Sequence, residues 1–250
     1  MKLYRVGGIL LACFVASSSF GQNNNLTRAE VAAIKAKLVA VQKAMGGDPE
    51  GYVKESEDFY LPTEFNPASD GKYWPISSSV SMRFTDRAVK EGTANAEQAS
   101  KDLEARYAAA LASGDPNAIA KMTQEVTKLS QLAVAASLSS EAKEDMSVDV
   151  QFNSSPYSGI DPDAVVFESP GVIALRDLSQ GNRVTVYLDP VALAETETLS
   201  SLRLQTPQDG VGNRTGVYNV TITLTGTGED IEAWAQSFDR DAMLAVIDPQ

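Results

Sequence analysis

The segment from Tyr52 to Trp74 holds the densest group of aromatic side chains in the sequence, with acidic residues among them. Aromatic faces beside carboxylates are typical of sites that bind sugars or peptides, because a ring contacts an apolar face of the ligand while a carboxylate accepts its hydrogen bonds. The embedded charged run is Lys54-Glu55-Ser56-Glu57-Asp58. The candidate ligand-binding residues are therefore Tyr52, Tyr60, Tyr73, Trp74, Glu55 and Glu57.

The same segment also fits a structural role, as an irregular loop held to the core by its large side chains. Pro62, Pro67 and Pro75 exclude a long helix. Within residues 50–85, only Ser77–Phe84 alternates apolar and polar residues as a strand does. Long ordered loops need such anchors and are also often functional, so both interpretations stay open.

The composition narrows the catalytic chemistry, because the chain has no histidine and one cysteine. These absences exclude Ser-His-Asp and Cys-His nucleophiles, zinc sites built on His or Cys, haem held by His, and iron–sulfur clusters. Glu55, Glu57 and Asp58 could supply the acid and base of a glycoside hydrolase, but that chemistry needs a set distance across the sugar. We therefore assign no catalytic residue and expect no metal and no cofactor.

Three further patterns have simpler explanations than a ligand site. Asp161-Pro162-Asp163 and Asp239-Arg240-Asp241 could offer oxygens to Ca²⁺, but neither continues as an EF-hand loop. Gly226-Thr227-Gly228 lies between a predicted strand and a predicted helix, where a phosphate loop would lie. Glu229 and Asp230 would repel a phosphate there, whereas acidic residues at a helix start favour the helix dipole.

A short echo links Gly181-Asn182-Arg183 to Gly212-Asn213-Arg214, and in each copy a valine and a tyrosine follow at the same offset. Two equivalent arginines at neighbouring loop ends could hold an anion. Two similar turns that lead into strands explain the echo equally well, with Gly-Asn supplying positive φ.

The part before residue 145 is predicted to be mainly helical. Thr27 and Glu30 form a capping box at the start of a helix over 26–45. Residues 86–143 are predicted to form an antiparallel αα-hairpin with its turn at Gly114-Asp115-Pro116. Its second arm carries an apolar seam, which consists of Ile119, Met122, Val126, Leu129, Ala133 and Ala136.

From Met146 onward the hydrophobic period becomes two, and short strands are predicted up to Leu224, followed by a helix over Asp230–Phe238 and a last strand over Met243–Ile247. The fold class is therefore α+β, with an N-terminal helical part that contains an αα-hairpin and a C-terminal, mostly antiparallel β-sheet or sandwich. The expected domains are a signal peptide (1–21), a helical domain (22–145) and a β domain with a short helix (146–250).

The N-terminus is predicted to be a secretory signal peptide. Lys2 and Arg5 form a positive region, an apolar stretch follows, and Ser19-Phe20-Gly21 precedes a cleavage site. An alternative is a lipid anchor, because Leu10-Leu11-Ala12-Cys13 resembles a bacterial lipoprotein box. The apolar stretch is too short to span a bilayer, which needs about 20 residues, so we expect no integral membrane span.

The formal charge of −12 argues against a nucleic-acid partner, since phosphate binding needs clustered Lys and Arg. We therefore expect an exported, non-catalytic binding or structural protein of the cell envelope, periplasm or extracellular space, with a protein or glycan ligand. The alternative is a carboxylate-dependent hydrolase, such as a glycoside hydrolase, that acts outside the cytoplasm.

The signal peptide gives the first testable prediction. The exported protein should begin at Gln22, and its intact mass should equal that of residues 22–250. A product that begins at an acylated Cys13 would contradict cleavage after Gly21 and would support the lipid anchor.

Overall fold

The computed structural model describes residues 24–114, 116–137, 143–193, 201–204, 206–207 and 209–249. The predicted signal peptide, Cys13 and Asp115 of the predicted turn lie outside the described residues, as do the side chains of Ala133 and Ala136. None of the helices in the described part combines the length and the apolar character that crossing a membrane requires.

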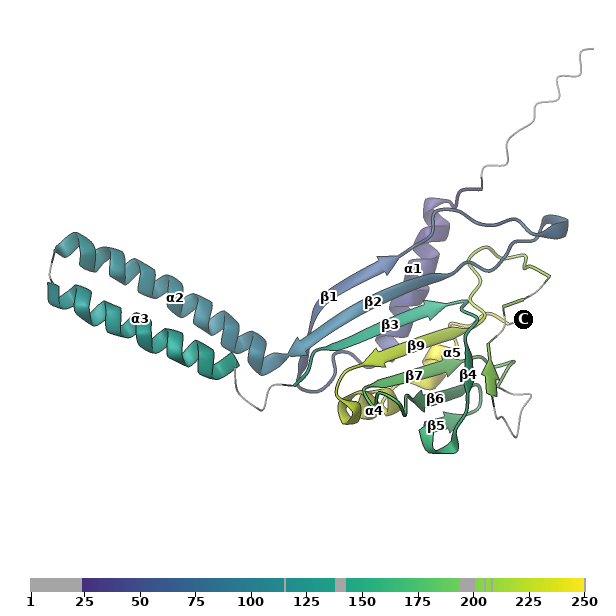
Figure 1. Cartoon of the computed structure of the whole chain (residues 1–250). Coiled ribbons are helices and arrows are strands. Elements are labelled where there is room, and N and C mark those ends of the chain that lie inside the picture. The colour runs from purple at the N-terminus through teal and green to yellow at the C-terminus, as the bar shows by residue number, and fades with distance from the viewer. Residues whose placement is uncertain are drawn as a thin grey trace, which may run out of the picture.

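One antiparallel sheet of seven strands forms the body of the protein, in the order β1-β2-β3-β9-β7-β6-β5 (Figure 1). Its strands are β1 (Tyr52–Tyr60), β2 (Ser78–Asp86), β3 (Met146–Phe152), β5 (Val165–Ser169), β6 (Val172–Arg176), β7 (Arg183–Leu188) and β9 (Val220–Thr225). A separate pair consists of β4 (Tyr157–Gly159) and β8 (Ser201–Arg203). The α+β class and the mostly antiparallel sheet are thus confirmed.

Strands from both sides of residue 145, where the composition changes, belong to the same sheet. β2 pairs with β3 from Ser78 opposite Phe152 to Phe84 opposite Met146. The first two strands of the sheet therefore come from the part before residue 145, and the helical hairpin is inserted between two strands that pair directly. The change in composition near residue 145 follows the end of this insertion.

The expectation of an irregular loop from Tyr52 onward is wrong for its first nine residues, which form the edge strand β1. The register shifts between Lys54 and Ser56, so the alternation of apolar and polar residues is interrupted. Charged side chains on an exposed edge oppose pairing with other chains. They also remove the alternation of apolar and polar residues from which a strand is predicted.

Helices cover one face of the sheet: α1 (Arg28–Ala44), α4 (Gly228–Gln236) and α5 (Arg240–Leu244). The Thr27–Glu30 capping box is confirmed, since the Thr27 N–H donates to Glu30 Oε2 at 2.7 Å and the Glu30 N–H donates to Thr27 Oγ1 at 3.2 Å. Leu38 and Val41 of α1 and Ile231 and Trp234 of α4 pack on the strand side chains of this face.

The predicted last strand over Met243–Ile247 is wrong, because Met243 belongs to the short helix α5. The Asp239 carboxylate accepts the Ala242 N–H at 3.0 Å and so begins a helical turn. Met243 is fully buried against the core. The apolar run Met243–Ile247 is too short for its periodicity to distinguish a strand from a helix.

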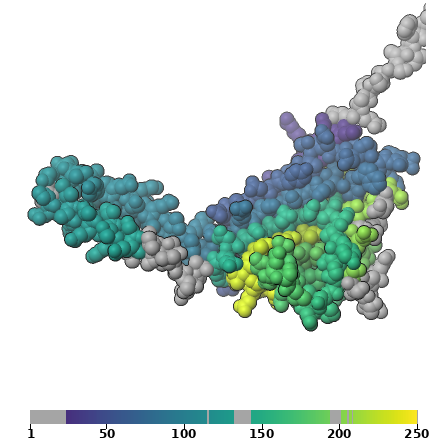
Figure 2. Space-filling view, viewed as in Figure 1, coloured from purple at the N-terminus to yellow at the C-terminus, as the bar shows by residue number. Residues whose placement is uncertain are grey.

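The predicted hairpin is confirmed as α2 (Arg87–Ser113) and α3 (Pro116–Ser137), joined at Gly114 with a left-handed φ of 66°. The hairpin projects from one end of the sheet as a narrow arm (Figure 1, Figure 2). Met122 is buried in its seam, but Val126 is 42% exposed, so the predicted seam is only partly right. Each helix has a single neighbour along the arm, which leaves part of the apolar stripe uncovered.

The carboxylate of Asp86 binds backbone groups on both sides of the hairpin's base. One oxygen accepts the N–H groups of Ala88 at 2.7 Å and Val89 at 3.3 Å, and the other accepts the Lys143 N–H at 3.0 Å. The hydrogen bond from Lys143 is the largest cause that lowers the pKa of Asp86 below its usual value. Asp86 thus ties the start of α2 to the chain that returns to β3.

We predict that Met122→Ala destabilises the arm by about 2–4 kcal/mol, because it removes a buried side chain from the seam. The matched change Val126→Ala should cost under about 1 kcal/mol, because that side chain is largely exposed. Hydrogen exchange should report faster exchange of the α2 and α3 amides in Met122→Ala, with the sheet amides unchanged. Equal effects of the two substitutions would contradict the described seam.

The Asp86 carboxylate should make stability depend on pH. Its pKa is lowered in the folded state, so its contribution is complete above the unfolded value of about 4 and is lost as pH falls through the folded value. Asp86→Asn should therefore be less stable than the parent at neutral pH, and the difference should shrink on acidification below about pH 4. Urea unfolding across this range measures it, and a difference that stays constant would contradict this role.

Candidate ligand-binding site

The candidate aromatic residues separate into anchors and exposed rings. Tyr52 is an anchor, because it is fully buried and its hydroxyl donates to Asp230 Oδ2 at 3.0 Å. Burial, followed by this hydrogen bond, raises the pKa of Tyr52 to about 12. Lys143 donates to Asp230 Oδ1 at 3.0 Å, so the Asp230 carboxylate joins β1, α4 and the return from the hairpin.

Tyr73 is also an anchor, within the loop that joins β1 to β2. Its ring packs edge-on against Phe65 at a centroid distance of 5.0 Å. The Arg214 guanidinium lies 4.5 Å from the Phe65 centroid and 4.9 Å from the Tyr73 centroid, and it pairs with Glu30 at 3.4 Å. The Tyr73 backbone also exchanges hydrogen bonds with Val211 at 2.9 and 2.8 Å. The structural interpretation therefore holds for these residues.

Tyr60 and Trp74 are the two exposed rings, with 67% and 43% of their surfaces accessible. Both line one surface pocket of about 560 Å³, together with Thr63, Glu64, Asn66 and Ser77. The backbone N–H of Trp74 donates to the Asn66 carbonyl oxygen at 2.9 Å, which fixes the backbone beneath the exposed ring. Two of the predicted residues thus line one pocket, with a large part of each ring accessible.

The acidic run does not join this pocket. Glu57 accepts hydrogen bonds from Gln42 Nε2 and Lys54 Nζ, each at 2.8 Å, and the bond from Lys54 is the main cause that lowers the pKa of Glu57. Neighbouring residues of a strand face opposite sides of a sheet, so Glu57, opposite Met82, and Asp58, opposite Ser81, point apart. Glu55 is exposed near the register shift.

The sequence did not single out the polar residues of the pocket. Thr63, Glu64 and Asn66 follow the end of β1, and Ser77 precedes β2. Their position depends on the antiparallel pairing of β1 with β2, which brings the two ends of the loop together. The prolines of this segment marked a loop, but no local pattern marked which of its polar residues would face one another.

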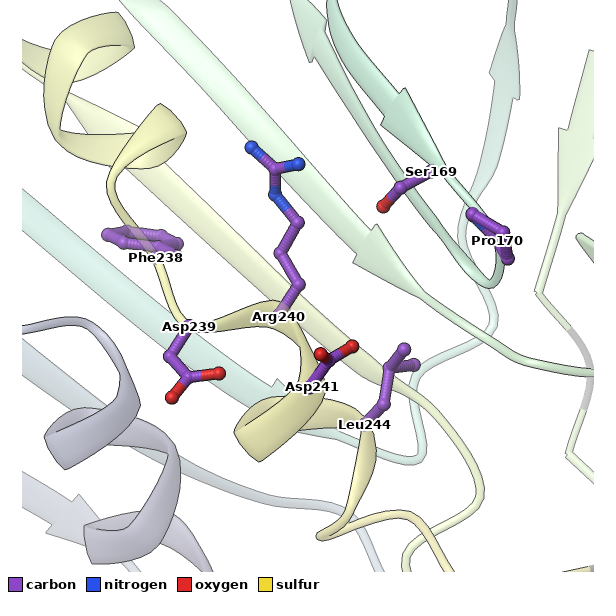
Figure 3. Close-up of a pocket in the computed structure, with 7 residues that line it drawn as sticks. All are labelled: Ser169, Pro170, Phe238, Asp239, Arg240, Asp241 and Leu244. Carbon is purple, nitrogen blue, oxygen red and sulfur yellow. The ribbon is translucent and has the colours of Figure 1, made fainter.

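A different pocket, of about 490 Å³, lies between the start of α5 and the turn that joins β5 to β6 (Figure 3). In the close-up, Arg240 extends away from α5 (Figure 3). Its guanidinium stacks on the Phe167 ring at 4.2 Å and donates to the Gln236 carbonyl oxygen at 3.2 Å. These contacts give Arg240 a packing role, and the Asp239 carboxylate begins α5.

The other sequence patterns have structural roles. The Asp161 carboxylate accepts the Asp163 N–H at 3.0 Å in a short turn. The described residues contain no group of three or more His, Cys, Asp or Glu side chains placed to hold a metal ion. Arg183 begins β7 beside Thr225, the last residue of β9, whereas Arg214 precedes β9, so the two echoed arginines do not meet.

Comparisons with family models, curated proteins and solved structures found no match.

Proposed function

We propose that this is an exported, non-catalytic binding protein that takes a glycan at the pocket between Tyr60 and Trp74. The observation that carries the proposal is the presence of two exposed aromatic rings in one pocket with two hydroxyls, an amide and a carboxylate. A pyranose ring offers apolar C–H faces and a rim of hydroxyls. Exposed rings and adjacent polar groups complement both features.

A carboxylate-dependent hydrolase is the weaker alternative. Glu64 is the one carboxylate among the described residues that line this pocket. Hydrolysis of a glycosidic bond by the usual route needs two carboxyl groups across the scissile bond, about 5 Å apart in retaining enzymes and about 6.5–9.5 Å apart in inverting ones. Glu57 is engaged by Gln42 and Lys54 outside the pocket. Binding without cleavage therefore suits the arrangement better.

The test uses residues 22–250 and six probes: cellotetraose, maltotetraose, chitotetraose and the C6-oxidised counterpart of each. At least one probe should bind in isothermal titration calorimetry and remain uncleaved. Trp74→Ala and Tyr60→Ala should each weaken that binding about tenfold or more, because each removes a stacking surface. Trp74→Phe should retain most of the affinity, because it keeps an aromatic face.

Stability provides the control for this experiment. Both alanine variants should melt within a few degrees of the parent, since the two rings are exposed and surface substitutions cost about 0.5 kcal/mol or less. Leu111→Ala, an exposed position on the distant arm, should leave both binding and melting unchanged. Absence of binding to all six probes, or equal binding by Trp74→Ala and the parent, would refute the proposed site.

A further inference from the structure

We infer that the glycan site continues from the Tyr60–Trp74 pocket across the helix-free face of the sheet, and that Arg183, at the start of β7 on this face, binds a carboxylate of an acidic sugar unit. This inference rests on the proposed function, and it adds the class of glycan and a residue that selects it.

The strand register lays out the site. Tyr60 lies opposite Ser79, Ser79 opposite Gln151, Gln151 opposite Thr221, and Thr221 opposite Tyr187. These residues therefore form one row across β1, β2, β3, β9 and β7, which lie side by side in that order (Figure 1). At about 4.8 Å between neighbouring strands, the row spans about 19 Å. Thr221 and Tyr187 are each only 8% exposed, so they form the floor of its far part, whereas Tyr60, Ser79 and Gln151 are accessible. Arg183 lies four residues before Tyr187 on the same face of β7, about 13 Å along the strand.

A second hollow, of about 570 Å³, lies over the far part of this row. Gln151, Ser154, Thr221, Thr223, Thr185 and Arg183 are among the residues that line it. It adjoins the first pocket, since Gln151 Nε2 donates to the Oγ atom of Ser77, which lines the Tyr60–Trp74 pocket, at 3.4 Å. The two hollows are therefore neighbours on this face, joined by the Gln151–Ser77 hydrogen bond between their linings.

The lining of the second hollow suits a polyhydroxylated ligand with a negative group. Its hydroxyls come from serine and threonine side chains, and its described lining residues include one cation, Arg183, and no carboxylate. Among the residues that the structure describes, Asp177 is the acid paired with Arg183, at 4.0 Å. Oδ1 of Asp177 accepts the Ser179 hydroxyl at 2.6 Å and the Ser179 N–H at 2.9 Å, while the 4.0 Å approach to Arg183 is made by Oδ2 and is too long for a hydrogen bond. The Arg183 side chain is 44% exposed and keeps donors for a ligand.

Charge complementarity identifies the occupant. The formal charge of the chain is −12, yet the described residues that line this hollow include a cation and no acid. Asp149, opposite Thr223 on the same face, lies outside the lining and accepts the Ser81 hydroxyl at 2.7 Å. A guanidinium matches a carboxylate with two parallel hydrogen bonds, whereas a neutral sugar gains less from it. The net charge disfavours a densely charged polyanion, so sparse sugar carboxylates suit this face better than a highly sulfated chain.

The experiment compares each neutral tetrasaccharide with its C6-oxidised counterpart, which carries carboxylates on the same backbone. The parent should bind at least one oxidised probe about tenfold more tightly than its neutral partner, as expected of one carboxylate–arginine pair. Arg183→Gln should abolish this preference and change the Kd of the neutral probe by less than about twofold. Arg183→Lys should restore part of the preference, because it retains the charge without the planar fork.

Arg83→Gln is the matched control, because Arg83 lies on the same face and in the same register row as Arg183 but outside the second hollow. It should leave the preference intact. Binding that depends on Trp74 but shows no acidic preference, or a preference that survives Arg183→Gln, would overturn this inference and leave the proposed function standing. Absence of binding to every probe would overturn both.

Discussion

The pleat of a single antiparallel sheet is the constraint on which the rest of the molecule depends. Adjacent residues of each strand face opposite sides, so Val148, Val150 and Phe152 pack under the helices while Ser147, Asp149 and Gln151 face the other way. α1, α4 and α5 cover only one face. The β4–β8 pair covers only one end of the other face, where Leu202 belongs to a buried cluster with Ile173, Leu175 and Tyr187. A polar strip of sheet remains open between that cover and the edge strand β1.

Patterns within one element were readable from the sequence, and patterns that depend on distant partners were not. The hairpin and the Thr27–Glu30 capping box follow from short-range spacing and were predicted correctly. β1 was missed because its register shift and its charges conceal the alternation. The Met243 segment was misread because a run of that length fits a helical turn as well as a strand. The pairing of β2 with β3 across the hairpin has no local signal at all.

The candidate site shows the same division. The density of aromatic residues located the right segment, but the sequence does not separate the anchors Tyr52 and Tyr73 from the exposed rings of Tyr60 and Trp74. That separation depends on partners far along the chain, namely Asp230 for Tyr52 and Arg214 for Tyr73. The polar lining depends on the register of the strands. An enrichment of aromatic residues therefore predicts where to look, and the tertiary contacts decide which of the rings can touch a ligand.

The ligand surface that we propose is the helix-free face of the sheet, from Tyr60 towards Arg183. Amide chemical-shift mapping by NMR with the tightest-binding tetrasaccharide tests this claim most directly. We expect the shifts to concentrate at Tyr60–Ser77, at residues 151–156, at the Thr221–Thr223 part of β9 and at Arg183–Thr185 of β7, with the arm and α1 unaffected. Shifts confined to the α2–α3 arm, or to α1 and α5 on the helical face, would contradict it.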